Sequence, residues 1–372
     1  MEREVFDINS IRKNIKLISS GEMESYTTFP LNANQRLEVH KLVESFCNLR
    51  SISSPVLGSQ HKNIKIVRNE KGQKEFELTS DAIKFFSLYA RVPLPNCDLR
   101  FLDYYLKELD PYFDCVRLFS LFNNELKKKQ LHELKSEATQ VRRKIIDHIK
   151  SSEEFSKFVE MNIDIPTGIL TKNKLYHQQH AGQYFVSIDV RSANYRVLKK
   201  FCPNLANTEW KEFISKFTNT QFIIESKYFR EVIFGELGHS KITKLPLIFV
   251  DNVGRMIESD PNLVGKMEKV FCSDDEIVYK VKKEFDTNIL EKNIEELLPG
   301  HFRVEKYKLS QIGQFTYFVR EFAEKKDFKN VPKKFIMQCV KYYKHRPITE
   351  VDRKFEDEDG LLATYDKSIF DN

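Results

Sequence analysis

Carboxylates stand at two turns of this 372-residue chain, and each turn could hold a hard divalent cation. Asp189 follows the β-branched and aromatic run 184–188, whose composition predicts a buried strand, and precedes a segment that predicts a helix. Asp274 and Asp275 lie between two short apolar runs, a pattern that indicates the tip of a hairpin. Together with Glu276 these acids repel one another unless solvent or a cation neutralises them. Taken singly, each segment is explained as well by an exposed polar turn.

A basic helix is predicted between the two turns, over residues 223–235. Lys227 and Arg230 are three residues apart and therefore share one face of this helix. Both side chains are charged donors that suit phosphate groups, and Arg can contact two phosphate oxygens at once. A solvated helix face often has the same spacing, so the pair alone does not assign phosphate binding.

The order of acid, basic helix and acidic hairpin over residues 175–325 resembles the palm and fingers of nucleic acid polymerases. In that family the strand-end aspartate and the hairpin hold two metal ions, which activate the primer 3′-hydroxyl and neutralise the triphosphate. The resemblance implies that Asp189 and Asp275 ligate Mg²⁺ or Mn²⁺ and that Asp274 assists them. It also implies that Lys227 and Arg230 hold the triphosphate of the incoming nucleotide.

Two further roles follow from the same resemblance. The segment DVRSANY is similar to the family B pattern of Asp, a small polar residue and then Tyr, which implies that Tyr195 lies under the incoming sugar and could select deoxyribose. Lys306, on a predicted strand after the hairpin, resembles a lysine that some family B enzymes place near the primer end. The implied partners are nucleoside triphosphates and DNA or RNA with a single-stranded part.

An earlier segment, residues 31–90, resembles the R3H domain, a small module that binds single-stranded nucleic acid. Arg36 and His40 are four residues apart on a predicted helix, and Leu49, Ser51 and Ser53 follow with the spacing of the family. The resemblance implies that Arg36 and His40 contact nucleic acid, because both can bind phosphate and imidazole can stack on a base. The glycine and arginine usual before the last strand of the family are replaced around positions 61–63.

Two other functions fit the same residues. The first is a two-metal nuclease with an RNase H-like sheet, in which Asp189, Asp251 and Asp274 or Asp275 stand at three strand ends; residues 245–250 are the strand predicted to end at Asp251. The second is a binding protein for single-stranded nucleic acid with no enzymatic activity, in which Asp189 and Asp275 lie far apart. Strand order distinguishes a palm from this nuclease, because a palm places the hairpin beside the Asp189 strand in an antiparallel sheet, whereas the nuclease sheet is mixed.

Composition sets broad limits on the protein. The chain has a formal net charge of +6, with 41% hydrophobic and 31% charged residues, a balance typical of globular domains and compatible with a nucleic acid partner. Its six cysteines show no CxxC spacing, which argues against a zinc ribbon or a disulfide framework. No segment approaches about 18 uninterrupted apolar residues. We therefore expect a soluble, intracellular protein without a membrane partner; nucleus, cytoplasm and viral factory are not distinguished.

The predicted fold class is α+β, with four segments. Residues 1–95 are expected to form the R3H-like module and residues 96–165 a helical spacer. The spacer prediction rests on apolar positions that recur at helical spacing between 98 and 161. Residues 166–325 are expected to form an antiparallel-sheet palm with helical fingers. Residues 326–372 are expected to form a helical, thumb-like segment, with helices beginning after residue 317 and a loose acidic tail.

Overall fold

The computed structural model describes residues 6–20, 22–44, 49–55, 62–68, 78–166, 168, 170 and 175–371. The chain divides into two compact units, Met1–Phe76 and Glu77–Asn372. Helix α3 (Ser80–Ala90), expected in the first module, therefore belongs to the second unit. The predicted spacer, palm and thumb-like segments all lie within that second unit. Of the positions 61–63 that depart from the R3H pattern, His61 lies outside the described residues.

The first unit is a three-stranded antiparallel sheet with two helices. Its isoleucines at positions 11, 15 and 18 recur at helical spacing and are buried, which explains why this stretch forms a helix with one apolar face. These residues pack with Val39 and Ile64 in a single core. The strand order is β1-β3-β2. The elements are α1 (Ile8–Ser20), β1 (Ser25–Thr27), α2 (Ala33–Glu44), β2 (Leu49–Pro55) and β3 (Lys62–Arg68).

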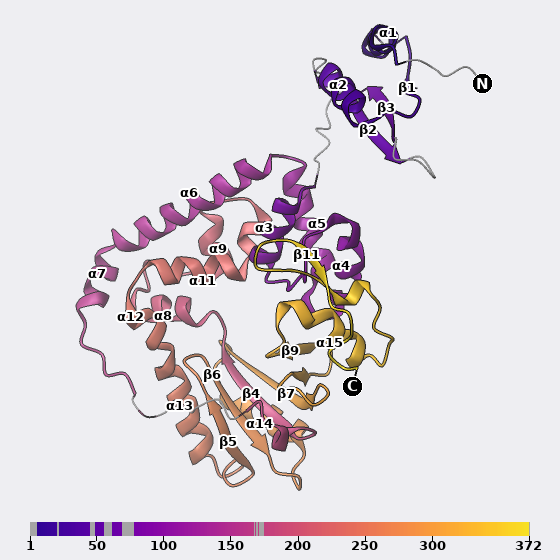
Figure 1. Ribbon diagram of the computed structural model, residues 1–372. Helices are drawn as coiled ribbons and strands as arrows, with labels where there is room; N and C mark the ends of the chain where they lie inside the picture. The colour runs from indigo at the N-terminus through magenta and orange to yellow at the C-terminus, as the bar shows by residue number, and fades with distance from the viewer. Residues whose placement is uncertain are drawn as a thin grey trace. The chain divides into compact units, whose positions relative to one another are not determined.

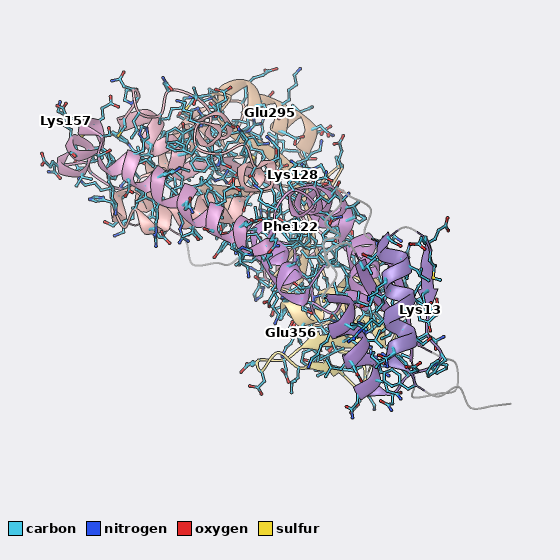
Figure 2. The ribbon with its side chains drawn as sticks, turned by 90° about the horizontal axis from the view of Figure 1, so that it is seen from above. Lys13, Phe122, Lys128, Lys157, Glu295 and Glu356 are labelled. Carbon is cyan, nitrogen blue, oxygen red and sulfur yellow. The ribbon has the colours of Figure 1, made fainter. Side chains whose placement is uncertain are left out.

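Five helices lie between Ser80 and Glu160, and the apolar positions between 98 and 161 that recur at helical spacing fall mainly within them. Phe122 of this helical region is buried, whereas Lys157 points outward (Figure 2). Helix α6 lies along α11 (Lys227–Glu236), on the side of the unit away from the large sheet (Figure 1). After α3 the helices are α4 (Leu99–Phe113), α5 (Cys115–Leu126), α6 (Leu131–Lys150) and α7 (Glu153–Glu160).

The second unit also contains a six-stranded sheet, and every strand pair in this sheet is antiparallel. The strand order is β5-β6-β4-β7-β8-β9. Strand β4 lies in the interior of the sheet and is buried on both faces, which explains its nearly continuous apolar sequence. The strands are β4 (Tyr184–Val190), β5 (Met267–Cys272), β6 (Glu276–Val281), β7 (Phe302–Gln311), β8 (Phe318–Glu321) and β9 (Lys326–Lys329).

The first four strands of this sheet are linked in the order β-α-β-β-α-β, the connectivity of ferredoxin-like sheets. Helix α13 (Pro246–Ser259) precedes β5, and α14 (Thr287–Leu297) joins β6 to β7. Between β4 and α13 the chain forms five further helices. They are α8 (Ala193–Phe201), α9 (Trp210–Ser215), α10 (Gln221–Glu225), α11 (Lys227–Glu236) and α12 (Ser240–Lys244), and a short 3₁₀ turn, η1 (Gln178–His180), precedes β4.

The two faces of the sheet differ in character. Val186, Ile188 and Val190 of β4 pack with α13 and α14 in one apolar core (Figure 1). Because side chains alternate along a strand, Phe185 and Asp189 point to the opposite face. Phe185 packs there with Tyr307 and other residues of a second, smaller cluster. Asp189 therefore stands on the face of the sheet that α13 and α14 leave uncovered.

The strand predicted over 245–250 is wrong, because these residues begin helix α13. Pro246 occupies the first turn, where its missing N–H costs nothing, and the buried positions 247, 250, 253 and 257 follow helical spacing. Asp251 consequently lies within a helix rather than at a strand end, and its carboxylate pairs with Arg255 at 2.7 Å.

The C-terminal segment also differs from expectation. Helices were predicted after residue 317, but β8 and β9 extend the sheet before the first helical residue. The tail is not loose: the Phe370 ring stacks on Tyr342 at a centroid distance of 4.0 Å, and the Ile369 amide donates to Gln338 Oε1 at 2.9 Å. The elements beyond the sheet are η2 (Lys333–Phe335), α15 (Ile336–Tyr343), η3 (Val351–Arg353), β10 (Lys354–Glu356) and β11 (Leu362–Thr364).

Within the described ranges, no helix is long and apolar enough to span a bilayer.

The buried Asp352 provides a test of this packed C-terminal segment. Its carboxylate has 0% exposure and accepts hydrogen bonds from the Tyr104 hydroxyl at 2.5 Å and from the Thr349 amide at 2.7 Å. Asp352→Ala leaves these donors unpaired, so we expect a loss of about 3 kcal/mol in the free energy of unfolding, measured with urea. Asp359→Ala, at an exposed acid of the same segment, should change it by less than about 0.5 kcal/mol. Equal effects of the two changes would contradict the packed arrangement.

Candidate functional site

Asp189 lies near the end of β4, between two charged neighbours on adjacent strands. In the register of the sheet, it is opposite Glu276 of β6 and opposite Arg303 of β7. The Arg303 guanidinium donates from Nη2 to Asp189 Oδ2 at 2.9 Å. The carboxylate side chain is 24% exposed, so it is mostly removed from water but still open to a ligand.

The acidic hairpin lies directly beside this aspartate. Strands β5 and β6 pair with each other, and β6 pairs with β4. The Val190 amide, one residue beyond Asp189, donates to the carbonyl of Asp275 at 2.9 Å. Within the turn, the Ser273 hydroxyl donates to Asp275 Oδ1 at 3.1 Å. The structure therefore brings Asp189, Asp274 and Asp275 together at the same end of strands β4, β5 and β6, although about eighty-five residues separate Asp189 from the aspartate pair in the chain.

Burial and neighbouring charges shift the pKa values of Asp189 and Asp274. Burial raises the pKa of Asp189 to about 6, the adjacent Arg303 guanidinium opposes this rise, and the carboxylates of Asp275 and Glu276 add to it. Burial likewise raises the pKa of Asp274, and the Asp275 carboxylate adds to the effect. A group of carboxylates whose ionised forms are disfavoured in this way is suited to bind a cation that relieves the repulsion.

The predicted basic helix is two helices that meet at Ser226. The Ser226 hydroxyl caps α11 by accepting the Phe229 amide at 3.1 Å, which begins a new helix at Lys227. Arg230 donates from Nη1 to the Ser192 hydroxyl at 3.1 Å. Lys227, whose side chain is 69% exposed, and Arg230 both act electrostatically on Asp189. The charges of α11 therefore act on Asp189.

The turn between β4 and α8 links these groups. Ser192 adopts the left-handed conformation at φ 53°, which is uncommon for a residue other than glycine. This conformation turns the chain from the end of β4 directly into α8. The Arg191 amide donates to the His301 carbonyl at 3.0 Å, so the turn is also tied to the start of β7. A strained backbone at a charged turn is a frequent feature of functional sites.

Two predicted site residues lie elsewhere. Tyr195 has 0% exposure, and its hydroxyl donates to the Thr208 carbonyl at 3.2 Å, so it has no surface with which to contact a sugar. Its ring packs edge-on against Trp210. Lys306 lies on the helix-covered face of β7 and forms an ion pair with Glu291 of α14 at 3.0 Å. Neither position supports the role that the polymerase resemblance implies.

Two arginines of the site were not identified from the sequence. Arg303 neutralises Asp189, and Arg320 of β8 binds both oxygens of Glu276, at 2.6 and 3.2 Å. Arg320 is 6% exposed and lies 4.9 Å from the centre of the Tyr307 ring, a cation–π contact. The only sequence signal is an arginine inside a short apolar strand, where an unpaired charge is costly and a partner must exist.

The donor set of the site suits a small, hard cation. Asp189 and Asp275 supply carboxylate oxygens, the ligand type that Mg²⁺ and Mn²⁺ prefer. Within the described part of the chain, no group of three or more His, Cys, Asp or Glu side chains is arranged to hold a metal ion. A metal held by Asp189 and Asp275 would therefore need further ligands, such as backbone oxygen, water or substrate phosphate. Such an arrangement is common for Mg²⁺.

The N-terminal unit has a separate candidate site on α2 and β2. His40 lies between two hydroxyls, with Nδ1 2.7 Å from Ser51 Oγ and Nε2 3.0 Å from Ser53 Oγ. Arg36 donates from Nη1 to the Leu31 carbonyl at 2.8 Å. The histidine and the two serines named by the R3H spacing thus form one hydrogen-bonded group, and both Arg36 and His40 remain half-buried at the surface.

Comparison of the chain with models of protein families, with curated proteins and with solved structures finds no match. A function must therefore be inferred from the residues of this chain alone.

The raised pKa of Asp189 predicts that the candidate site lowers the stability of the fold. A carboxyl whose pKa rises from 3.8 to about 6 on folding costs the folded state about 3 kcal/mol at pH 7.5. Asp189→Asn removes this cost but leaves Arg303 without its anionic partner, so we expect a net gain of about 1–2 kcal/mol in EDTA. Below pH 6 the wild-type carboxyl takes up a proton and the cost falls, by about half at pH 5.

Urea unfolding of wild type and Asp189→Asn at pH 7.5 and pH 5 measures this difference. Asp103→Asn, at a carboxyl that is 83% exposed, is the matched control and should show little gain at either pH. A loss of stability on Asp189→Asn at pH 7.5 would mean that its ion pair outweighs the repulsion.

Proposed function

We propose that the chain is a template-directed nucleotidyltransferase of the nucleic acid polymerase type, with its active site at Asp189 and Asp275. The observation that carries this proposal is the position of the acidic hairpin. It lies next to the Asp189 strand in an antiparallel sheet, and the cations of α11 act on the same carboxylate. A palm is expected to have this arrangement, whereas the nuclease is expected to have a mixed sheet and the binding protein to have Asp189 and Asp275 far apart.

The proposed division of labour follows the charges of the site. Asp189 and Asp275 would hold Mg²⁺ or Mn²⁺, which when bound would lower the pKa of a primer 3′-hydroxyl and neutralise phosphate charge. Asp274, beside them at the turn, would add to the negative potential that attracts the cation. Lys227 and Arg230 would bind the β- and γ-phosphates. In-line attack of the 3′-hydroxyl oxygen on the α-phosphorus would form the new phosphodiester bond, break the bond to the β-phosphate, release pyrophosphate at these two cations and pass the hydroxyl proton to solvent.

Arg303 and Arg320 have positioning roles in this proposal. Arg303 contacts both Asp189, at 2.9 Å, and Glu305, at 3.3 Å, and so holds the Asp189 carboxylate at the end of its strand. Arg320 holds Glu276, the residue after the aspartate pair, through two hydrogen bonds. Preorganised side chains of this kind reduce the reorganisation that a charged transition state would otherwise require.

The proposed substrates are nucleoside triphosphates and a primed DNA or RNA strand with a single-stranded part. The hydrogen-bonded group of His40, Ser51 and Ser53, together with Arg36, supports a proposed role of the N-terminal unit in binding single-stranded nucleic acid. Selection of deoxyribose by Tyr195 is not part of the proposal, because that side chain is buried.

The two alternatives have less support. The RNase H-like nuclease requires a mixed sheet and a third carboxylate at a strand end, whereas all pairs of the six-stranded sheet are antiparallel and Asp251 lies within α13. If the chain were a binding protein without a catalytic site, nothing would require Asp189 to lie beside Asp274 and Asp275, where burial and repulsion raise its pKa and lower the stability of the fold.

Primer extension tests the proposed activity. Purified protein is supplied with a labelled primer and template, dNTPs or NTPs, and Mg²⁺ or Mn²⁺. We expect template-dependent extension that falls by roughly 100-fold or more in Asp189→Asn and in Asp275→Asn. Asp251→Asn is the matched control and should retain activity within about threefold. Metal-dependent shortening of the labelled strand would favour the nuclease, and absence of both reactions from the wild type would contradict an enzyme.

The role of Arg230 is tested by steady-state kinetics of the same reaction. Arg230→Gln removes a charge from the proposed phosphate site, so the KM for the nucleotide should rise by about tenfold or more. Lys306→Gln removes a lysine from the helix-covered face of the same sheet and should leave KM within about twofold. If the lysine change has the larger effect, the assignment of α11 to phosphate binding is wrong.

A further inference from the structure

A cavity separate from the carboxylate site lies on the helix-covered side of the sheet. It has a volume of about 470 Å³ and is lined by residues of α8, of α13 and of the turn that leads into β7. Phe302 contributes to its wall and belongs to the apolar core beneath α13 and α14, on the face away from the Asp189 side chain. The side chains that the inference uses are Arg196, Lys199, Lys200, Phe249, Met256 and His301.

One side of this cavity is strongly cationic. Arg196, Lys199 and Lys200 come from one face and end of α8, and only Glu209 is paired with them in the described structure, at 2.8 Å from Arg196 and 2.7 Å from Lys199. Three cations and one carboxylate leave a formal charge of +2 at this side. The Nε of Arg196 is buried without a hydrogen-bond partner among the described residues, although buried donors are nearly always paired.

The other side of the cavity is apolar and aromatic. The Phe249 ring lies 6.0 Å from the His301 ring, and the Lys200 ammonium lies 5.0 Å from the centre of Phe249. Burial lowers the pKa of His301, and the nearby charges of Arg196 and Lys200 lower it further. His301 is therefore a neutral ring near pH 7, suited to stack against a planar ligand.

We propose that this cavity binds a mononucleotide, with its phosphate at the cations of α8 and its base against the aromatic side formed by Phe249 and His301. A charge of +2 matches the phosphate monoester dianion, whereas a fatty-acid carboxylate supplies a single negative charge. The volume lies within the range of about 300–1,000 Å³ found for small-molecule sites. This inference does not depend on the proposed polymerase activity, because it uses no residue of the Asp189 site.

Binding of AMP in EDTA, without template or divalent metal, tests the proposal by isothermal titration calorimetry. We expect wild type to bind AMP and inorganic phosphate, with AMP the tighter ligand because its base adds aromatic contacts. Lys200→Gln should weaken AMP binding by about tenfold, equivalent to about 1.4 kcal/mol. Met256→Trp, which fills the apolar side, should weaken AMP more than phosphate. Thermal unfolding checks that both variants fold, and Lys199→Gln provides a second charge variant.

Three controls locate the ligand. Lys216→Gln removes an exposed lysine that lies 5.9 Å from another phenylalanine ring, Phe213, and should leave AMP binding unchanged. Asp189→Asn and Arg230→Gln alter the proposed active site and should also leave it unchanged. The proposal is overturned if AMP does not bind at millimolar concentration, if oleate binds and AMP does not, or if Arg230→Gln abolishes AMP binding while Lys200→Gln does not. Loss of primer extension in Asp189→Asn with AMP binding intact separates the two sites.

Discussion

Repulsion among the carboxylates at the end of β4 is the constraint on which the candidate site depends. The register of the sheet sets Asp189 opposite Glu276 and next to the Asp274–Asp275 turn, and burial raises the pKa of Asp189 to about 6. Such a cluster is tolerated only where cations neutralise it. Arg303 contacts Asp189 directly and Arg320 binds Glu276, so strands β7 and β8 supply charges that the hairpin and β4 lack. The pairing of strands β4, β6, β7 and β8 is therefore what brings Asp189 and Glu276 each to the arginine that neutralises it.

Strand β4 and helix α8 also connect the two faces of the domain. Alternation along β4 directs Asp189 to the face opposite α13 and α14, and Val190 to the core beneath α13. The Ser192 turn then starts α8, whose last turns carry the lysines of the proposed nucleotide cavity. One short segment thereby supplies a carboxylate to the proposed catalytic site and cations to the proposed nucleotide site.

Much of the secondary structure and the elements of the site could be predicted from local sequence. The helical region 98–161, the strand before Asp189 and the 272–276 hairpin were each indicated by spacing or composition, and the structure has these elements. The helix predicted over 223–235 is instead two helices that meet at Ser226. Errors arose where short apolar runs have two explanations: residues 245–250 were predicted as a strand but begin a helix, and the segment after 317 continues the sheet. In both, packing against neighbouring elements decided the outcome.

The sequence by itself determined which groups can carry charge and which segments can bury an apolar face, because these properties depend on residue type and on spacing of two to four positions. Only the tertiary structure decided their partners. Sheet register joined Asp189 to Arg303 across 114 residues and turned Lys306 to the opposite face, while helix packing buried Tyr195. A shift of one residue in register exchanges the faces of a strand, so these pairings are set by the whole sheet rather than by any local motif.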